Sequence, residues 1–309
     1  MDKPLLSICI PTYNRANYLE QCLESIVSQE CFDARVEVVI SDNCSADDTR
    51  KIGMRYQEKY ANIHYFRNEE NLIDMNFPLV FQRANGYLRK LTNDTVVYKP
   101  GAVQYMLKAA EENKEKKPQI YFLALGKLHR DPKIISSVEE YIDTIQINLT
   151  WIRSFAIWDV DCDDLGTLVS KSDSRLAQVP YLLENFKRHG RAVIYDAPIM
   201  ETIPVARKDI SYGLYKVFYM TFLGFIKPYL EAGEISGDCL ERLRKSLLLE
   251  FFCEWIVNKE KYPDRFVFSD EDLRKLVEDE YRGEPYFGQY KRKLIRMQLK
   301  ADVKRLLKR

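Results

Sequence analysis

The first 125 residues alternate between strand-like and helix-like hydrophobic patterns, and this alternation constrains the fold more than any other feature. Short, mostly apolar runs, which are typical of buried strands, occupy residues 5–10, 36–40, 63–66, 87–91 and 120–125. Between these runs, apolar residues recur at helical spacing, as at Leu19, Leu23 and Ile26. Strands that alternate with helices form a mostly parallel sheet with helices on both faces. We therefore predict an α/β fold.

The pattern changes beyond about Glu201, where strand-like runs give way to long helical patterns rich in aromatic and charged residues. A chain of 309 residues is long enough for one large α/β unit with an appendage, or for two domains. We predict a boundary near Pro204. The α/β domain then spans residues 1–205, with halves at 1–110 and 111–205, and a helical C-terminal region spans residues 206–309.

The charge and cysteine content exclude several classes of protein. With 47 basic and 46 acidic residues, the chain gives no sign of a nucleic-acid partner. The seven cysteines include no CxxC pair, which argues against a disulfide framework or a zinc ribbon and favours a reducing compartment. No signal peptide precedes the first strand-like run, and the apolar stretch 217–226 is too short to cross a membrane. We therefore expect a cytoplasmic protein.

Polar segments follow three of the predicted strands, at residues 11–15, 41–43 and 93–95. Ligands of open α/β sheets bind beyond the carboxyl ends of the strands, so these three segments are expected to converge at one site. Each segment alone is also consistent with a solvated turn, because Asn, Asp and Ser favour turns for backbone reasons. Three such segments at one edge favour a binding site.

The residues of these segments resemble a known family. The run from Leu6 to Arg15 (LSICIPTYNR) is similar to the opening of inverting family 2 glycosyltransferases of GT-A fold, bacterial enzymes that build polysaccharides. The similarity continues in blocks at 38–45, 67–72, 84–87 and 100–102, in order and properly spaced over about the first 110 residues. The resemblance implies a GT-A fold with a C-terminal helical appendage, and a nucleotide-sugar site.

A nucleoside diphosphate needs a platform for its base, hydrogen-bond partners, and positive charge beside its phosphates. By resemblance, Pro11, Tyr13 and Asp42 serve the nucleotide, and Arg67 lies beside the base. Lys90 faces a phosphate or pairs with an acid, and both alternatives remain open. The predicted nucleotide-sugar site comprises Pro11, Tyr13, Arg15, Asp42, Asn43, Arg67, Lys90, Asn93 and Asp94.

The acidic triplet of the family, Asp-any-Asp, falls on Asn93, Asp94 and Thr95, as counted back from Pro100-Gly101. Its last acid commonly binds a divalent ion, Mg²⁺ or Mn²⁺, at the donor phosphates, but Thr95 offers only a neutral oxygen. Either Asp94 takes that role, or Lys and Arg side chains replace the ion, or the triplet is only a turn.

Inverting transfer also needs a general base for the acceptor hydroxyl. Our candidates are Asp163 and Asp164, in an acidic cluster before the strand-like run 165–169, with Glu184 as a second choice. A solvated acidic loop is the alternative. Trp151 and Trp158 either stack on sugar rings or pack in the core.

Residues 291–309 carry nine Lys or Arg residues and a single acid, while Ile295, Leu299, Val303 and Leu306 keep helical spacing. This pattern predicts a basic amphipathic helix suited to an anionic membrane surface. A solvated helix docked on the domain and a disordered tail are the alternatives.

The sequence thus predicts a cytoplasmic enzyme, peripheral to the inner face of the plasma membrane. It would transfer a sugar, with inversion, from a nucleotide-diphosphate donor to a saccharide acceptor, such as a lipid-linked capsule or O-antigen intermediate. One alternative is a non-catalytic relative that binds nucleotide or glycan, or serves as a partner subunit. The other is a sugar nucleotidyltransferase, although the chain has no glycine-rich phosphate loop near its N-terminus.

Overall fold

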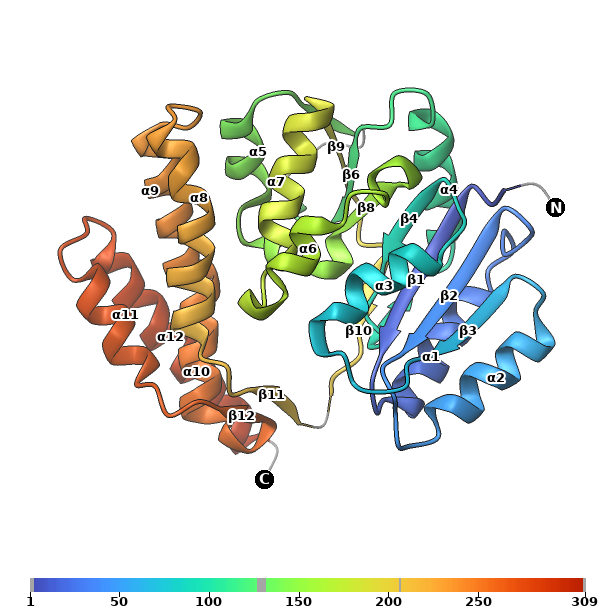
Figure 1. Ribbon diagram of the computed structural model, residues 1–309. Coiled ribbons are helices and arrows are strands. Elements are labelled where there is room, and N and C mark those ends of the chain that lie inside the picture. The colour runs from blue at the N-terminus through green and yellow to red at the C-terminus, as the bar shows by residue number, and fades with distance from the viewer. Residues whose placement is uncertain (1–2, 127–131, 206, 308–309) are drawn as a thin grey trace. The chain divides into compact units, whose positions relative to one another are not determined.

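The computed structural model describes residues 3–126, 132–205 and 207–307, and the chain divides into two compact units (Figure 1). The α/β unit comprises Met1–Ser137 and Asn148–Pro204. The helical unit comprises Val138–Ile147 and Val205–Arg309. The segment Val138–Ile147, which the sequence analysis assigned to the α/β domain, therefore groups with the C-terminal helices.

The described part of the α/β unit is built on an eight-stranded sheet of order β3-β2-β1-β4-β8-β6-β9-β7. Neighbouring strands are parallel from β3 to β4 and between β6 and β9, whereas β8 is antiparallel to both its neighbours and β7 is antiparallel to β9. The sheet strands are β1 (Leu6–Thr12), β2 (Val36–Asp42), β3 (Ile63–Arg67), β4 (Leu88–Leu91), β6 (Gln119–Leu123), β7 (Lys133–Ile135), β8 (Phe155–Trp158) and β9 (Ala192–Asp196).

Helices cover both faces of this sheet, as the alternation predicted (Figure 1). On one face, α1, α2 and α4 share a hydrophobic core with the inward side chains of β1, Leu6, Ile8 and Ile10. On the other face, α3 packs against β1 and β2, and α7 packs against β6. The helices of this unit are α1 (Ala16–Val27), α2 (Thr49–Lys59), α3 (Asn76–Arg83), α4 (Ala102–Asn113), α6 (Gly166–Ser170) and α7 (Gln178–His189).

Two local predictions are wrong. The run 165–169 forms the short helix α6 and not a strand, since Leu165 and Leu168 are buried at helical spacing while Val169 is exposed. Strands also continue past Glu201 in short pairs: β10 (Met200–Thr202) is antiparallel to β5 (Val96–Tyr98), and β11 (Lys208–Ile210) is parallel to β12 (Phe266–Phe268). Three-residue strands are too short to show an alternating pattern.

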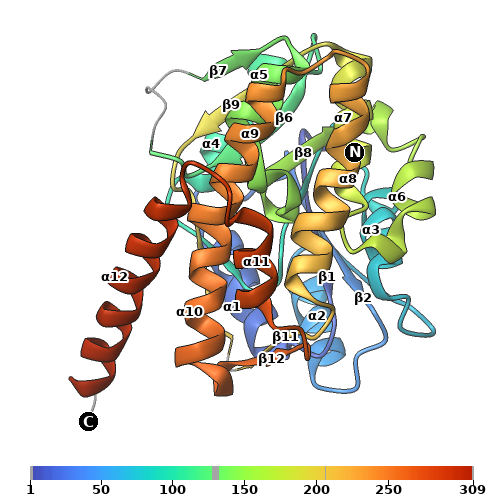
Figure 2. The same ribbon diagram turned by 90° about the vertical axis from the view of Figure 1, so that its left-hand side faces the viewer.

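The helical unit buries large aromatic side chains, including Phe222, Phe252, Tyr281 and Tyr290. Its last helix, α12, packs along α10 (Figure 2). Among the described residues, no helix combines the length and the apolar character that crossing a membrane requires. The helices are α5 (Val138–Ile145), α8 (Phe222–Glu231), α9 (Gly237–Ser246), α10 (Cys253–Lys261), α11 (Leu273–Tyr281) and α12 (Phe287–Leu306), with π-helical turns at Lys216–Thr221 and Leu247–Phe252.

Candidate functional site

The three polar segments of the sequence analysis meet at one edge of the sheet, which we call the carboxyl edge (residues 11–15, 41–47, 67–76 and 92–96). The strand register places Thr12 beside Asp42, and Asp42 beside Arg67. On the other side of β1, the amide of Thr92 donates to the carbonyl oxygen of Cys9 at 2.9 Å. The ends of β1, β2, β3 and β4 are therefore in register, because all four strands run in the same direction.

The loops after β1 and β2 are fastened to each other. The Asn43 amide donates to the carbonyl of Thr12 (2.9 Å), and the Asn14 amide donates to Ser45 Oγ (2.9 Å). Asn14 Oδ1 in turn accepts from the amide of Ala46 at 2.7 Å. Asn14 has a φ of 51°, a left-handed conformation that asparagine tolerates better than most residues. The result is a preformed turn that holds Tyr13 outward.

The sequence analysis missed the roles of Asn14, Ser45 and Asp47. Ser45 lies four residues before the start of α2 at Thr49, and its hydroxyl accepts from the loop after β1. Asp47 accepts from the amides of Ala16 (3.0 Å) and Thr49 (3.1 Å), so one carboxylate serves the starts of both α1 and α2. The sequence signal for these three roles was a cluster of short polar side chains. Local spacing shows that such side chains are present but not which neighbouring loop they bind.

Asp42 is fully buried at the end of β2. Its Oδ1 accepts from the Ser45 amide at 2.9 Å, and its Oδ2 accepts from the Tyr65 hydroxyl at 2.5 Å. The Nε of Arg67 lies 3.8 Å from the same Oδ2. Burial, together with the Asp42 carboxylate, raises the pKa of Tyr65. Asp42 thus holds the Tyr65 ring and the Arg67 guanidinium at the carboxyl edge.

Asn43 is buried and holds the loop that follows β3. Its side-chain nitrogen donates to Asn71 Oδ1 (2.7 Å), and its side-chain oxygen accepts from Asn68 (2.9 Å) and from the amide of Leu72 (2.8 Å). These contacts satisfy the amide group, so its role here is to position the loop.

Asp94 is 5% exposed and lies against the loop after β1. Thr12 Oγ1 donates to its Oδ2 at 2.8 Å, and Arg15 Nη1 lies 3.3 Å from its Oδ1. Burial raises the pKa of this carboxyl, and Arg15 and Thr12 act in the opposite direction. The Arg15 guanidinium is about one-third exposed, so it brings a positive charge to the surface of the carboxyl edge.

Comparison with known families agrees with this geometry. A family model described as glycosyl transferase family 2 matches residues 7–122, which contain the four aligned strand ends. The chain carries a glycosyl transferase family 2 domain. The abequosyltransferase RfbV of Salmonella typhimurium is 46% identical over 84 residues, which is 26% of this chain and 25% of that protein.

Other relatives of the family 2 domain are named for glycosyl transfer as well. A beta-1,3-glucosyltransferase of Campylobacter jejuni, named for a GalNAc(5)-diNAcBac-PP-undecaprenol substrate, is 38% identical over 66 residues, 21% of each chain. The chain spans between about a fifth and a third of the length of the first curated relatives that it matches.

Solved structures confirm the predicted GT-A fold. S. aureus TarS 1–349 in complex with UDP superposes with a TM-score of 0.56 at 16% identity, over 98% of this chain and 92% of that one. The mannosyltransferase PcManGT of Pyrobaculum calidifontis, in complex with GDP-Man and Mn²⁺, gives a TM-score of 0.55 at 13% identity, over 99% and 88%.

The side chains of this family 2 domain do not fit a divalent cation held by the protein alone. Mg²⁺ takes six oxygen ligands in sites of this kind, usually one or two protein carboxylates together with waters and substrate phosphates. Asp94 supplies the single acid of the triplet, and Arg15 and Thr12 already bind it. Where the structure describes this edge, no three His, Cys, Asp or Glu side chains bring ligand atoms together. No step proposed below passes through a metal ion.

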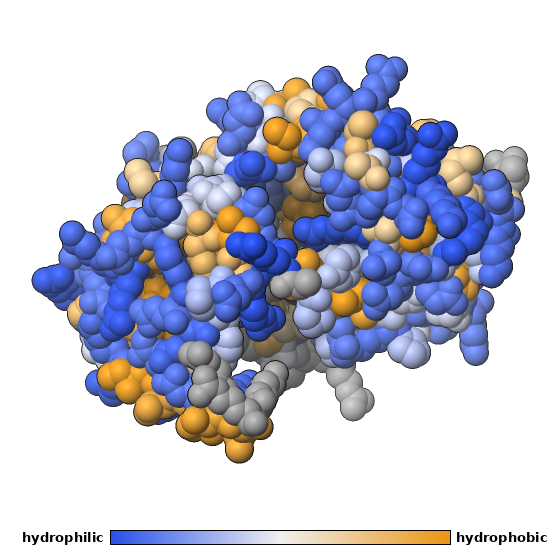
Figure 3. Space-filling model, turned by 90° about the horizontal axis from the view of Figure 1, so that it is seen from below, coloured by the Kyte–Doolittle hydropathy of each residue, from blue (hydrophilic) through white to orange (hydrophobic). Residues whose placement is uncertain are grey.

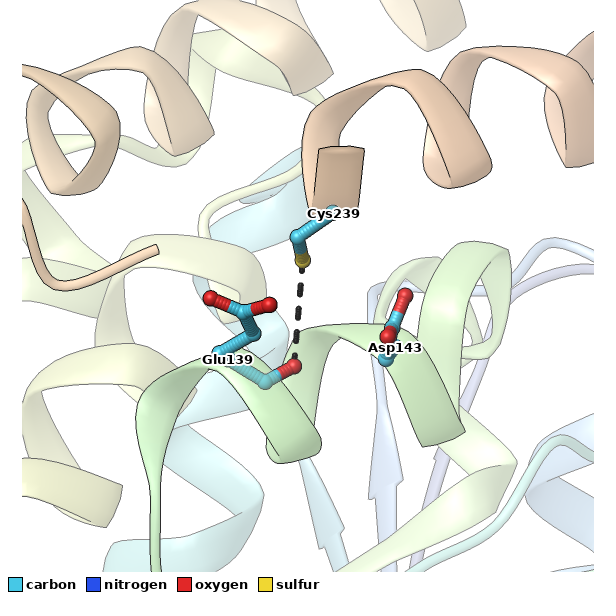
Figure 4. Close-up of side chains that lie close together, drawn as sticks. All are labelled: Glu139, Asp143 and Cys239. Carbon is cyan, nitrogen blue, oxygen red and sulfur yellow. Dashed lines mark hydrogen bonds between the residues drawn. The ribbon is translucent and has the colours of Figure 1, made fainter. Parts of the chain in front are cut away.

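A separate group of possible ligands, Glu139, Asp143 and Cys239, lies in the helical unit (Figure 4). Arg242 pairs with Asp143 at 2.5 Å and with Glu139 at 3.4 Å, and Ser236 donates to Glu139 twice, each at 2.8 Å. Burial raises the pKa of the Cys239 thiol to about 12, so the sulfur keeps its proton at neutral pH. These contacts explain the group as a helix-to-helix tie.

Asp163 and Asp164 do not lie at the carboxyl edge. Because β8 is antiparallel to β4, Trp158 at its end pairs with Leu88 at the start of β4, and the acidic cluster emerges at the opposite edge. Asp164 is exposed and pairs with Arg188, near the end of α7, at 2.6 Å. The structure therefore does not bring Asp163 and Asp164 together with the residues of the carboxyl edge, and a general base among them stays a prediction. Glu184 is also exposed and accepts a hydrogen bond from Thr167.

The reversed strand separates the two tryptophans. Trp158 is completely buried, and its indole N–H donates to the Pro118 carbonyl at 2.7 Å, so it is a core residue. Trp151 precedes β8 and therefore lies on the side of the carboxyl edge, with its ring 42% exposed and the Arg153 guanidinium 5.1 Å from its centre. Trp151 remains the candidate for stacking on a sugar.

Lys90 does not face the carboxyl edge surface. It is fully buried, and its ammonium donates to the carbonyl of Leu91 at 2.7 Å and to that of Arg153. The sequence analysis expected a phosphate or an acid as the partner of Lys90, and the structure shows two backbone carbonyl groups instead. Burial, with a smaller effect of Arg153, lowers its pKa from 10.5 to about 7.

This lowered pKa predicts a pH-dependent stability. Between about pH 7 and pH 10.5 the unfolded chain holds a proton on Lys90 that the folded protein releases, so stability rises with pH in this window. Relative to Lys90→Met, the wild-type free energy of unfolding should increase by up to about 1.4 kcal/mol per pH unit. Urea unfolding at several pH values tests this, with the exposed Lys108→Met as control. Parallel curves for wild type and Lys90→Met would contradict it.

Proposed function

We propose that this family 2 domain binds a nucleotide-diphosphate sugar at the carboxyl edge and transfers the sugar, with inversion, to a saccharide acceptor. The observation that carries the proposal is the placement of the partly exposed Arg15 guanidinium against Asp94, where the ends of β1 and β4 meet, in the same loop as the exposed Tyr13 ring. A platform for a base and a cation for a diphosphate are the two groups that such a donor requires.

The acceptor is proposed to be a lipid-linked saccharide, such as a capsule or O-antigen intermediate. The name of the Campylobacter relative includes a PP-undecaprenol substrate, and RfbV is named an abequosyltransferase. We also propose a cytoplasmic location, with contact to the inner face of the plasma membrane through residues 291–309. Of these, Lys308 and Arg309 lie outside the described residues.

Transfer would proceed by a single displacement. The acceptor oxygen forms a bond to the anomeric carbon, while the bond from that carbon to the diphosphate oxygen breaks and the nucleoside diphosphate leaves with the electron pair. Pro11 and Tyr13 hold the base, and Asp42 fixes Arg67 beside it. Arg15 offsets the negative charge that develops on the leaving group, in the manner of cations that stabilise transferring phosphates.

The acceptor proton must pass to a base on the same side of the sheet. Asp42, Asp47 and Asp94 already hold the loops of this edge, and further acids on the same side of the sheet include Asp74, Asp196 and Glu201. Asp74 follows Asn71 and Leu72, Asp196 ends β9 and accepts from the Leu125 amide at 2.6 Å, and Glu201 pairs with Lys99 at 2.8 Å. Burial raises the pKa of Asp74, and Arg175, whose Nη1 lies 3.4 Å from Asp74 Oδ1, acts in the opposite direction. A carboxylate whose pKa is raised accepts a proton more readily than an ordinary one. We propose Asp74 as the base.

This assignment predicts unequal effects of removing acids. Asp74→Asn should lower turnover by about 100-fold or more, the usual contribution of a general base. Asp163→Asn and Asp164→Asn should stay within about twofold of wild type, since Asp164 loses only an exposed ion pair. Steady-state rates of diphosphate release measure all three. A large loss of turnover for Asp163→Asn or Asp164→Asn alone would contradict the assignment of Asp74 and indicate a general base at the opposite edge of the sheet.

The test of the function is direct. The full chain is incubated with a panel of nucleotide sugars and a saccharide acceptor in Mg²⁺, Mn²⁺ or EDTA, and diphosphate release is followed alongside thermal shift. Release supports the transferase. Thermal stabilisation by donors without release favours a non-catalytic binding protein, and release of pyrophosphate indicates a nucleotidyltransferase. If EDTA abolishes release, a cation bound chiefly by the donor phosphates belongs to the reaction.

A further inference from the structure

Helix α12 has two apolar sides, and one of them is bare. On the inner side, Tyr290, Leu294 and Ala301 are buried, and the helix packs along α10. On the outer side lie five large apolar residues whose exposed fractions run from 54% to 82%: Ile295, Leu299, Val303, Leu306 and Leu307. Figure 3 shows apolar side chains gathered at the lower left of the molecule.

The two sides are opposite each other. At about 100° per residue, Ile295, Leu299, Val303 and Leu306 fall within about 80° of one another on the helix, and Leu307 extends the arc to about 120°. Leu294 and Ala301 fall roughly on the far side. Ile295 and Leu299 are exposed in the same turns in which Leu294 and Ala301 are buried, so the helix is packed on its inner side while its outer stripe is bare.

Positive charge borders the outer stripe. Arg292, Arg296, Lys300 and Lys304 are exposed, and within residues 3–126, 132–205 and 207–307 none of them forms an ion pair with a carboxylate. Asp302, the one acid of the segment, is held by Lys261 at 2.8 Å. The outer face of α12 thus combines an apolar centre with an uncompensated cationic border.

We propose that this outer face of α12 docks on an anionic lipid surface. Such a surface has negative headgroups above an apolar interior, so it can take up the apolar stripe and the cations at the same time. Each cation near an anionic surface contributes to the attraction, and each buried apolar side chain adds to it.

A second copy of the chain fits this face less well. Two copies related by a twofold axis would bring identical patches together, and the cations of each border would face those of the other. The nine residues described for this face, five apolar and four cationic, also fall short of the roughly 20–30 residues per partner of a standard protein interface. The membrane therefore explains both features of the face, whereas a dimer explains only one.

This inference deepens the proposed function, since a lipid-linked acceptor would lie in the same membrane, but the docking itself requires no catalysis. The site on the α/β unit and the face on the helical unit can accordingly be tested separately.

The experiment is co-sedimentation of the full chain with vesicles of phosphatidylcholine, with and without phosphatidylglycerol. We expect binding to the anionic vesicles, and a loss of at least about tenfold in the partition coefficient for Leu299→Glu. Met220→Glu is the matched control, because Met220 is also 61% exposed and also lies in the helical unit. Lys300→Glu with Lys304→Glu should weaken binding to anionic vesicles and leave the neutral ones unaffected.

Three outcomes would overturn the proposal: no binding to anionic vesicles, equal losses for Leu299→Glu and Met220→Glu, or a dimer in sedimentation velocity that Leu299→Glu abolishes. Circular dichroism checks that the variants are folded. Diphosphate release with a soluble acceptor should be unchanged in Leu299→Glu. If release is absent from every form while vesicle binding follows the expected order, the proposed function fails and the docking face stands.

Discussion

Replacing Arg15 with alanine is expected to lower diphosphate release by about 100-fold or more. The guanidinium lies 3.3 Å from Asp94 and is about one-third exposed at the carboxyl edge, where the leaving group of the proposed reaction gains negative charge. Removing one group aimed at such a charge costs about 10²–10³ in rate in well-studied enzymes. Arg15→Lys should recover part of the rate, since it keeps the charge but loses the planar fork.

A variant of Asp94, the partner of Arg15, distinguishes a loss of catalysis from a loss of stability. Arg15→Ala alone leaves the buried Asp94 carboxylate with Thr12 as its remaining hydrogen-bond donor, which lowers stability as well as activity. The double variant Arg15→Ala/Asp94→Asn removes that uncompensated charge. We expect the double variant to regain melting temperature and not turnover, as measured by thermal unfolding and by the release assay.

Arg35 provides the matched control, because it is an exposed arginine paired with Asp33 at 2.7 Å, just before β2 and so at the opposite edge of the sheet. Arg35→Ala should release diphosphate at close to the wild-type rate. If Arg15→Ala keeps a rate within about threefold of wild type, Arg15 does not stabilise the leaving group and the catalytic part of the proposal is lost.

Gly86→Ala is expected to destabilise the α/β unit by about 3 kcal/mol, or roughly 6–12 °C in melting temperature. A Cβ at this position would lie 2.4 Å from Ser7 Oγ, 2.8 Å from the Ser7 nitrogen and 3.1 Å from the Leu6 carbonyl carbon. Two of these atoms belong to the backbone of β1, which is buried in the sheet and cannot move aside. The Gly86 amide also donates to Ser7 Oγ at 2.8 Å, a bond that the displaced backbone would lose.

Two variants sharpen this test. In Gly166→Ala, the new Cβ meets only Asp164 Oδ1, at 3.7 Å, so its melting temperature should match that of wild type. Ser7→Ala combined with Gly86→Ala removes the closest contact but keeps both backbone contacts, and it should recover only part of the loss. A Gly86→Ala protein that melts like wild type would show that β4 can shift away from β1.

The sequence predicted the sheet and its helices well where periodicity is long. Leu6 to Ile10 and Val36 to Ile40 are mostly apolar runs, interrupted only by Ser7 and Glu37, and such runs become buried central strands in an α/β sheet. The convergence of the polar exits followed from the same reasoning, since parallel strands bring their carboxyl ends to one edge.

The direction of a single strand and the burial of a single residue could not be predicted in this way. The reversal of β8 depends on pairing with β4 and β6, which a local pattern does not encode, and it places Asp163 and Asp164 at the edge opposite the carboxyl edge. Lys90 reads as a surface residue by type, yet two carbonyl groups satisfy its ammonium inside the protein. On α12, the apolar stripe that the sequence showed is the outer one, while the packed side uses Tyr290, Leu294 and Ala301.

The fastening of the loops after β1 and β2 has a consequence for affinity. Asn14, Asn43 and Ser45 hold these loops with hydrogen bonds that need no ligand. A donor that binds there would freeze few backbone torsions, so little of its interaction energy would be spent on lost conformational entropy. Selectivity among donor bases would then depend on the fixed shape of these loops and less on their closing around the nucleotide.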